Sequence, residues 1–234
     1  MRQCTGCREM KNKKEKMFAK SIDKIKSKIY NKAKQKIADN LFCKKQIIKK
    51  EILNMVKIIS DSTCDLSPEL IAKYDIDILP LHILLGEDEY EDGKNITPEQ
   101  IYSWSDENKT TPKTSAPALT DAIELFKPYI DEGREIVCFS ISSSMSTSGN
   151  VMRIAAEELE AEDCITVIDS ANLSTGIGLL VIEAAIMAQN NHTVEEIVSA
   201  IEALKPNVRA SFVVDTLTYL YRGGRCNAGS AMAG

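Results

Sequence analysis

The sequence predicts an α/β fold over residues 55–234, with a mainly parallel sheet and helices on both of its faces. Short apolar runs, typical of buried strands, alternate along this region with segments whose apolar residues recur every three or four positions, as in amphipathic helices. A helix between two strands is the usual crossover between parallel neighbours, and successive crossovers place helices on both faces of a sheet.

The first strand and the first helix are predicted at residues 56–60 and 68–74. The strand, VKIIS, is an apolar run that ends in the polar turn DSTCDLSP. Ser67 is a good N-cap because its hydroxyl can accept a hydrogen bond from the first helical turn, and Pro68 suits the first helical position. The helix then continues through ELIAKY.

The next extended segment is IDILPLHILL, residues 76–85, in which Pro80 marks an edge or a bend because it lacks an N–H. We expect residues 86–95, GEDEYEDGKN, to form an acidic loop. Thr97 and Pro98 then begin another capped helix.

The rest of the region repeats this alternation. Further strands are predicted at 135–141, 164–170 and 208–216. Amphipathic or largely apolar helices are predicted at 117–133, 149–163, 176–191 and 193–205. In sheets of this kind, ligands bind beyond the carboxyl ends of the strands. Polar clusters fall at these ends and predict a site there: Asp61-Ser62-Thr63, Ser142 to Ser148, Asp169-Ser170 and Asp215-Thr216.

The charge is divided unevenly along the chain. Residues 1–55 hold 17 Lys and Arg against 5 Asp and Glu, whereas the remaining residues hold 12 against 29. The field of this acidic part repels phosphates, so we expect no nucleic-acid binding. No apolar run reaches the roughly 18–20 residues of a membrane span, and no secretory signal is recognisable. The 7 scattered cysteines fit reduced thiols, so a cytoplasmic protein is predicted.

The N-terminal segment, residues 1–54, is expected to be a basic, partly helical extension. The CTGC motif at residues 4–7 is spaced like half of a zinc site, but Cys43 is the only further ligand nearby, so we predict no metal. An apolar stripe at helical spacing begins at Ile22 among lysines. Such a helix could lie on an anionic membrane or on RNA. We favour a solvated helix without a specific role, or a translation start at Met55.

Common catalytic motifs are missing from the sequence. It contains neither a GxxxxGK[ST] phosphate loop nor a GxSxG nucleophile elbow. Gly176-Ile177-Gly178 lies in an apolar helix and indicates close helix packing. Of the 2 histidines, His82 lies in an apolar strand and His192 in a polar turn, and neither has an obvious nucleophile partner. A hydrolase or phosphotransferase that uses Asp61 is kept as the enzymatic alternative.

Two clusters of hydroxyl residues stand at expected helix entrances. Residues 140–149, SISSSMSTSG, contain 6 serines and 1 threonine, and residues 112–117, PKTSAP, contain a Thr–Ser pair. At a helix N-terminus, hydroxyls and free N–H groups together bind a carboxylate or a phosphate without a metal. One hydroxyl suffices to cap a helix, so the surplus favours an anion site over capping alone.

At these motifs the sequence resembles the DegV family. VKIISDSTCDLSPELIAKYDIDILPLHI, PKTSAP, ISSSMSTSG, VIDS and FVVDTLTYLYRGGR follow one another in the family's order over residues 55–234. The resemblance implies a bacterial, two-domain fatty-acid-binding protein that buries a long acyl chain, such as that of palmitate, in a tunnel. It implies a protein without a cofactor that presents the bound carboxylate to the catalytic subunit of a fatty acid kinase and does not itself catalyse.

By this resemblance, the carboxylate is held by the threonine of a TSxP motif and a serine of an SSxxS motif, which are Thr114 and Ser146 here. The neighbours Ser115, Ser142 and Ser143 are implied as part of the same site. Three further residues are candidates for the pocket: Asp61, Ser62 and Arg222.

The sequence departs from the family's usual pattern at several positions. Ala116 stands where the family usually has glutamine, and Thr147 replaces a glycine of the serine motif, so this turn is expected to approach a ligand less easily. The family also continues into a second domain, which carries a histidine for the carboxylate and closes the tunnel. We expect that domain to be mostly missing here. A degenerate remnant that binds no lipid is therefore kept as a second alternative.

Overall fold

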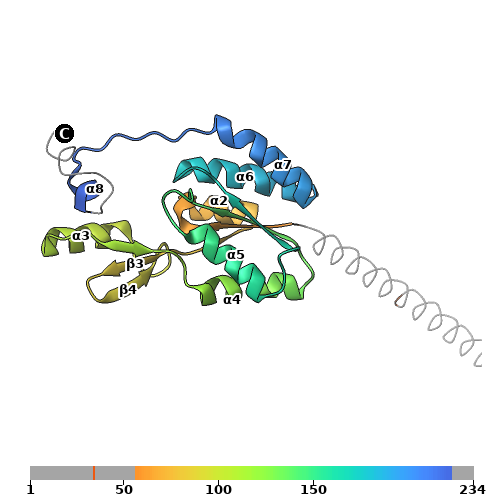
Figure 1. The fold of residues 1–234 in the computed structure, drawn as a ribbon, viewed down its shortest axis with the longest axis horizontal. Coiled ribbons are helices and arrows are strands. Elements are labelled where there is room, and N and C mark those ends of the chain that lie inside the picture. The colour runs from red at the N-terminus through yellow and green to blue at the C-terminus, as the bar shows by residue number, and fades with distance from the viewer. Residues whose placement is uncertain (1–33, 35–55, 223–234) are drawn as a thin grey trace, which may run out of the picture. The chain divides into compact units, whose positions relative to one another are not determined.

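The structure is a computed structural model that describes Lys34 and residues 56–222, and Figure 1 shows its elements. The expectations about the basic extension, namely the CTGC motif, the apolar stripe and the start at Met55, lie outside the described residues. Lys34 alone of that segment is described, as an exposed helical residue.

The main sheet has four parallel strands in the order β2-β1-β6-β7. They are β1 (Lys57–Asp61), β2 (Ile76–Leu79), β6 (Ile136–Ser140) and β7 (Ile165–Asp169). In the register, Ile58 of β1 lies opposite Ile76 on one side and Val137 on the other. The strand order reverses between β1 and β6, and open sheets of this type bind ligands at such a point, beyond the carboxyl ends of the strands. The predicted α/β class with a parallel sheet is confirmed.

Helices cover both faces of the main sheet, as predicted. One face is covered by α2 (Pro68–Tyr74), α6 (Thr175–Gln189) and α7 (Val194–Leu204), and the other by α4 (Leu119–Asp131) and α5 (Ser148–Glu158). Successive strand side chains point to opposite faces, so Phe139 joins the first hydrophobic cluster and Cys138 the second. Burial of each large apolar side chain in these clusters contributes about 1.5–3 kcal/mol to the stability of the fold. Together these side chains hold the strand ends in place.

The first residues of three helices, α2, α3 (Pro98–Asn108) and α7, are fixed by hydroxyl side chains that cap them. Ser67 accepts a hydrogen bond from the first turn of α2 at 3.4 Å, and Thr97 forms a capping box, as predicted for both; Thr193 caps α7 in the same way.

The predicted packing role of Gly178 is also confirmed. A Cβ at this position would lie 2.7 Å from the carbonyl oxygen of Cys64, so only glycine lets α6 approach the turn after β1 so closely.

A second, antiparallel sheet, with the order β4-β3-β5, was not predicted. Its strands are β3 (His82–Leu85), β4 (Asp88–Glu91) and β5 (Lys113–Ser115), and α3 (Pro98–Asn108) lies between β4 and β5 in the chain. The predicted single segment 76–85 is two strands in different sheets, because Pro80 has no N–H for a continuous ladder. The predicted acidic loop 86–95 contains β4, whose charged side chains are tolerated at the edge of a sheet.

The PKTSAP motif does not form a helix entrance, contrary to the prediction. Thr114 lies in β5, opposite Ile83 of β3. Helix α4 begins only at Leu119, and its N-cap, Ala118, makes no side-chain hydrogen bond. A residue that precedes a proline is disfavoured in the helical conformation, so the chain stays extended up to Pro117.

Residues 208–216 form an irregular segment between the 3₁₀ helix η2 (Lys205–Asn207) and α8 (Thr218–Arg222), so the predicted last strand is wrong. Phe212 and Val213 in this segment are 64% and 97% exposed. An apolar, β-branched run favours a strand only where another strand pairs with it, and neither sheet of residues 56–222 includes this segment.

Neither Lys34 nor residues 56–222 contribute a helix with both the length and the apolar character that crossing a membrane requires. Within the same described residues, no group of three or more His, Cys, Asp or Glu side chains could hold a metal ion.

Candidate functional site

Asp61 joins the carboxyl ends of β1 and β6. Its Oδ2 atom accepts hydrogen bonds from the Ile141 N–H and the Ser148 hydroxyl, both at 2.9 Å, and its Oδ1 atom accepts one from the Thr63 hydroxyl at 2.5 Å. Ser148 is itself buried and begins α5. One carboxylate therefore fixes the start of α5 and the turn before it against the main sheet.

The surroundings of Asp61 are those of a structural carboxylate. Its side chain is 0% exposed, and burial raises the pKa of its carboxyl above the ordinary value, while hydrogen bonds from Thr63, Ile141 and Ser148 draw that pKa back down. Both oxygens are occupied, so Asp61 is not placed to attack a substrate. This geometry gives no support to the enzymatic alternative that uses this residue.

The serine turn, residues 141–147, links β6 to α5. The N–H groups of Met145 and Ser146 donate to the Ser142 carbonyl oxygen at 2.8 and 3.2 Å. The Ser146 hydroxyl oxygen accepts a hydrogen bond from the Ser148 N–H at 3.2 Å, which leaves the hydroxyl proton for another acceptor. Ser146 therefore lies at the N-terminal end of α5, where the helix dipole favours an anion.

Asp169, at the carboxyl end of β7, holds the other side of the serine turn. Its Oδ1 atom accepts hydrogen bonds from the N–H groups of Ser143 at 3.2 Å and Ala171 at 2.9 Å. Partial burial acts to raise the pKa of this carboxyl, but the hydrogen bonds from Ser143 and Ala171 and the nearby Lys205 hold the pKa below its ordinary value. Asp169 is thus ionised at neutral pH and anchors Ser143.

Thr114 and Ser115 reach the site on the second sheet. In the pairing of β5 with β3, Thr114 lies opposite Ile83 and Ser115 lies opposite His82. Because successive side chains of a strand point to opposite faces, Thr114 shares a face with Ile83. Both Thr114 and Ser115 are exposed.

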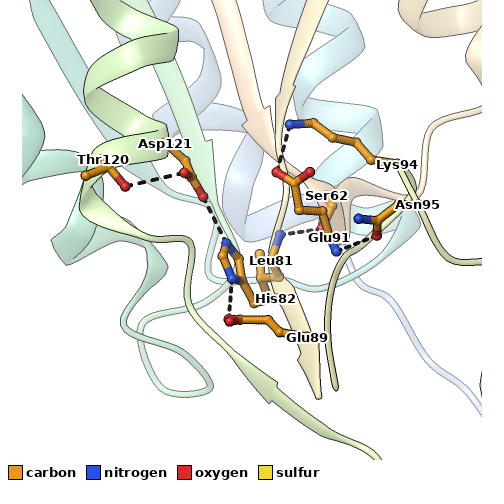
Figure 2. A network of polar contacts seen from close by, with 9 residues as sticks. All are labelled: Ser62, Leu81, His82, Glu89, Glu91, Lys94, Asn95, Thr120 and Asp121. Atoms are coloured by element: carbon orange, nitrogen blue, oxygen red, sulfur yellow. Dashed lines mark hydrogen bonds and ion pairs between the residues drawn. The ribbon is translucent and has the colours of Figure 1, made fainter. Parts of the chain in front are cut away.

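Figure 2 shows how the second sheet is fastened to the main one. Nδ1 of His82 lies 2.6 Å from Glu89 Oε1, and Nε2 lies 2.9 Å from Asp121 Oδ2 of α4. The hydrogen bond with Glu89 and, after it, the contacts with Asp121 raise the pKa of His82, against the effect of partial burial. The Leu81 N–H donates to the Ser62 hydroxyl at 3.1 Å. The second sheet is therefore tied both to α4 and to the turn after β1.

A pocket of about 690 Å³, here called the hydroxyl pocket, is lined by residues of both hydroxyl clusters. Thr114 and Ser115 of the PKTSAP motif line it together with Ser143 and Ser146 of the serine turn. Four of the five predicted ligand residues are thus brought to one place, although the two clusters lie far apart in the sequence.

The other predicted residues lie outside the hydroxyl pocket. The Ser142 hydroxyl lies 2.9 Å from that of Ser144, which does line the pocket. Asp61 contacts the serine turn through the hydrogen bond that its carboxylate accepts from the Ile141 N–H. Ser62 lines a smaller pocket of about 310 Å³, and Arg222 lines a third pocket of about 720 Å³.

The apolar and acidic sides of the hydroxyl pocket were missed from the sequence. Leu81, Ile83 and Met145 supply apolar surface, and Asp92 lines the same pocket. The period-two pattern Leu81-His82-Ile83 is a signal that could have placed the two apolar residues on one face. Asp92 lies among many acidic residues, and no local pattern distinguishes it.

A family model described as "uncharacterised protein, DegV family" matches residues 55–234. The chain belongs to the DegV family. A DegV domain-containing protein of Clostridium perfringens is 37% identical to it over 180 residues, which cover 77% of this chain and 64% of that protein.

Two solved structures are similar to this DegV chain. A stearic-acid-binding protein of Eubacterium ventriosum has a TM-score of 0.66 and 34% identity, over 75% of this chain and 63% of that one. A DegV family protein of Thermus thermophilus, solved for its fatty acid binding, has a TM-score of 0.67 and 28% identity, over 76% of this chain and 63% of that one. The predicted family is confirmed.

This DegV chain spans about 64% of the length of the Clostridium protein and 63% of each of the two solved chains. What whole DegV proteins bind, and what they act with, is therefore a proposal for this chain.

Proposed function

We propose that this chain binds a long-chain fatty acid, such as palmitate, with the carboxylate held by Thr114 and Ser146. One observation carries the proposal: the two hydroxyl clusters, each on a different sheet or turn, line a single pocket. The ligand class is supported by the Eubacterium relative, which binds stearic acid, and by the Thermus relative, solved for fatty acid binding.

The polar end of the hydroxyl pocket suits a carboxylate. A carboxylate only accepts hydrogen bonds, and each hydroxyl can donate one. Ser146 adds the favourable field at the start of α5, so a singly charged head group is stabilised there without a lysine or a metal. In this proposal the carboxylate lies between Ser146 at the start of α5 and the strand that carries Thr114.

The remaining lining sets the orientation of the ligand. Leu81, Ile83 and Met145 offer apolar surface on which methylene groups are removed from water. Asp92 repels a carboxylate, so the head group is expected at the Thr114–Ser146 end and away from Asp92.

We infer that the chain presents the bound carboxylate to the catalytic subunit of a fatty acid kinase and does not itself catalyse. Thr114, Ser115 and Ser143 are exposed, so a carboxylate bound beside them stays within reach of a second protein. Such a partner consumes ATP, so we propose that the activity is cytoplasmic.

Solvent extraction of the purified full chain, followed by mass spectrometry, tests the ligand class, and we expect a stoichiometric long-chain fatty acid. Titration with palmitate then tests the residues. Thr114→Val and Ser146→Ala each remove one hydrogen bond to a charged group, which is worth about 1.5–3 kcal/mol, or a Kd roughly 10- to 150-fold higher.

Matched controls are Thr120→Val and Ser103→Ala, which alter exposed hydroxyls that do not line the hydroxyl pocket. Their Kd values should equal that of the unmodified chain. A chain that yields no lipid and shows no saturable binding of palmitate would support the degenerate remnant instead.

A further inference from the structure

His82 lies between the two parts of the molecule that supply the hydroxyl clusters. It belongs to β3, which pairs with β5, the strand that carries Thr114. Its two ring nitrogens contact Glu89 of β4 at 2.6 Å and Asp121 in the first turn of α4 at 2.9 Å, as Figure 2 shows. These three side chains are here called the histidine clamp. His82 does not line the hydroxyl pocket, so an effect of His82 on a ligand has to pass through its neighbours.

From Asp121 the connection continues through α4 to the serine turn. The next residue, Ala122, is fully buried and belongs to the same hydrophobic cluster as Met152 of α5. Helix α5 follows the serine turn directly in the chain. The histidine clamp therefore joins the sheet that carries Thr114 to the helices that hold the serine turn.

The second sheet depends on such contacts for its position. Its apolar cluster, around Ile83, is separate from the two clusters that cover the main sheet. The hydrogen bond between Leu81 and Ser62 ties this sheet to the turn after β1, and the histidine clamp ties it to α4. When the clamp is released, the sheet keeps only the first of these two ties, and the spacing of the two hydroxyl clusters is no longer fixed.

The histidine clamp needs a charged ring. A carboxylate oxygen only accepts hydrogen bonds, so both ring nitrogens of His82 must carry a proton for both contacts to form. A neutral ring turns the lone pair of one nitrogen toward a carboxylate, which breaks that hydrogen bond and adds repulsion. The hydrogen bond with Glu89, and after it the contacts with Asp121, hold the pKa of His82 above its ordinary value, against the effect of partial burial. The clamp is therefore closed at neutral and lower pH, and it weakens when the ring loses its proton.

Charged groups face His82 from each of the elements packed against β3: Glu89 and Glu91 of β4, Asp121 of α4 and Lys113 of β5. Glu91 lies opposite His82 in the register, and its carboxylate is paired with Lys94 at 2.9 Å. Lys113 lies on the same face of β5, two residues before the position opposite His82. The two carboxylates in direct contact with the ring therefore dominate its surroundings.

We propose that His82 is a positioning residue for the fatty acid, because its protonated ring holds the second sheet against α4 and so keeps Thr114 and Ser146 at the spacing that one carboxylate bridges. The proposal rests on the proposed function, which assigns the carboxylate to these two hydroxyls. Binding of a fatty acid then weakens once His82 loses its proton. By reciprocity, a bound fatty acid makes the ring harder to deprotonate.

Calorimetric titration of the full chain with dodecanoate, at pH values from 5.5 to 9, tests the proposal. The Kd of each variant is divided by that of the unmodified chain at the same pH, which cancels the titration of the ligand itself. For His82→Leu this ratio should be at least about 5 at pH 5.5, the lower end of the usual coupling between sites, and should fall toward 1 at pH 9.

Asp121→Asn is the conservative variant that separates positioning from a merely structural role. An amide accepts a hydrogen bond from a charged ring and donates one to a neutral ring, so the clamp stays closed in both states. The Kd ratio of this variant should therefore fall by about 5-fold between pH 5.5 and pH 9, because only the unmodified chain loses affinity. A ratio that stays constant would mean that the ring does not act through Asp121.

Proton nuclear magnetic resonance reads the same coupling from the other side. The chain has 2 histidines, so the His82 imidazole signals are those that remain in His192→Leu. Saturation with dodecanoate should move the titration midpoint of these signals to higher pH. His192→Leu also serves as the matched control for the Kd ratio, because His192 contacts Glu196 at 2.9 Å but lies in an exposed turn and does not line the hydroxyl pocket. Its ratio should stay near 1 at every pH.

A Kd ratio for His82→Leu that does not change with pH, or a His82 midpoint that does not move when dodecanoate binds, would overturn the proposal. Should His82→Leu fail to fold, the profile of Asp121→Asn and the imidazole titration of His192→Leu decide the question. An unmodified chain that binds no dodecanoate at any pH would instead overturn the proposed function, which the other outcomes leave standing.

Discussion

Replacing Asp61 with alanine removes the acceptor on which the carboxyl ends of β1 and β6 are joined. Three donors lose their partner: the N–H of Ile141 and the hydroxyls of Ser148 and Thr63. Asp61→Asn is the matched variant, because asparagine keeps the shape and one acceptor oxygen, and its amide can donate to the Thr63 hydroxyl.

The size of the effect follows from burial. Ser148 is 0% exposed, so its hydroxyl cannot turn to water, and a buried donor left unsatisfied costs about 1–3 kcal/mol. Ile141 and Thr63 are partly exposed and recover part of their loss through water. Removal of a buried charge offsets some of the cost. We expect Asp61→Ala to lower the free energy of unfolding by about 2–4 kcal/mol, and Asp61→Asn by about 1 kcal/mol or less.

Urea denaturation followed by far-ultraviolet circular dichroism measures both values, and an unchanged m-value shows that the same surface is exposed on unfolding. A loss below about 1 kcal/mol for Asp61→Ala would refute the reasoning, since it would mean that the three hydrogen bonds do not hold the serine turn. So would an equal loss in both variants, because the acceptor oxygen of asparagine would then make no difference.

The pH dependence gives an independent check. The pKa of Asp61 is raised by burial, so the folded state takes up the proton more readily than the unfolded state. Relative to Asp61→Asn, the unmodified chain should therefore gain stability as the pH falls through the folded pKa, and the gain should level off below the unfolded value of 3.8. A relative loss on acidification would show that the hydrogen bonds outweigh burial.

Two further outcomes are expected. Gly178→Ala places a Cβ 2.7 Å from the Cys64 carbonyl oxygen and should lower the free energy of unfolding in urea by about 1–3 kcal/mol; a change within about 0.5 kcal/mol would mean that α6 shifts freely. His82→Gln should lower Tm by the largest amount at pH values below 6.5, the pKa of an unfolded histidine. The pKa of His82 is raised in the folded state, so its charge stabilises the fold at low pH, and this stabilisation is lost as the pH rises through the folded pKa. The Tm deficit should shrink at high pH, and a deficit independent of pH would contradict the assignment.

The main sheet was predictable because its signals are local. Apolar strand runs, the N-cap at Ser67 and the capping box at Thr97 each depend on residues within one or two turns of chain. The placement of Ser146 at the start of α5 follows from the same local rules.

The second sheet depends on pairings that no local pattern carries. Pro80 predicts an edge or a bend, but the sequence near it does not say that His82 onward pairs with residues 113–115 rather than with the main sheet. For the same reason the local pattern predicts a helix entrance at Thr114, whereas the position of Thr114 is set by pairing with Ile83. Residues 208–216 show the opposite error, because a strong local strand pattern there joins neither sheet of the described residues.

The Pro80–Leu81 junction between the two sheets also has a dynamic consequence. The second sheet has its own small apolar cluster around Ile83, separate from the two clusters of the main sheet. Elements with separate cores can open separately, with a lower free energy for the smaller one. A molecule that contacts both Thr114 and Ser146 couples the opening of the second sheet to that of the main sheet, because neither sheet can then open without releasing the molecule. With this molecule bound, the slowly exchanging amides should therefore include those of β3 and β5. Without it, slow exchange should be confined to amides of the main sheet.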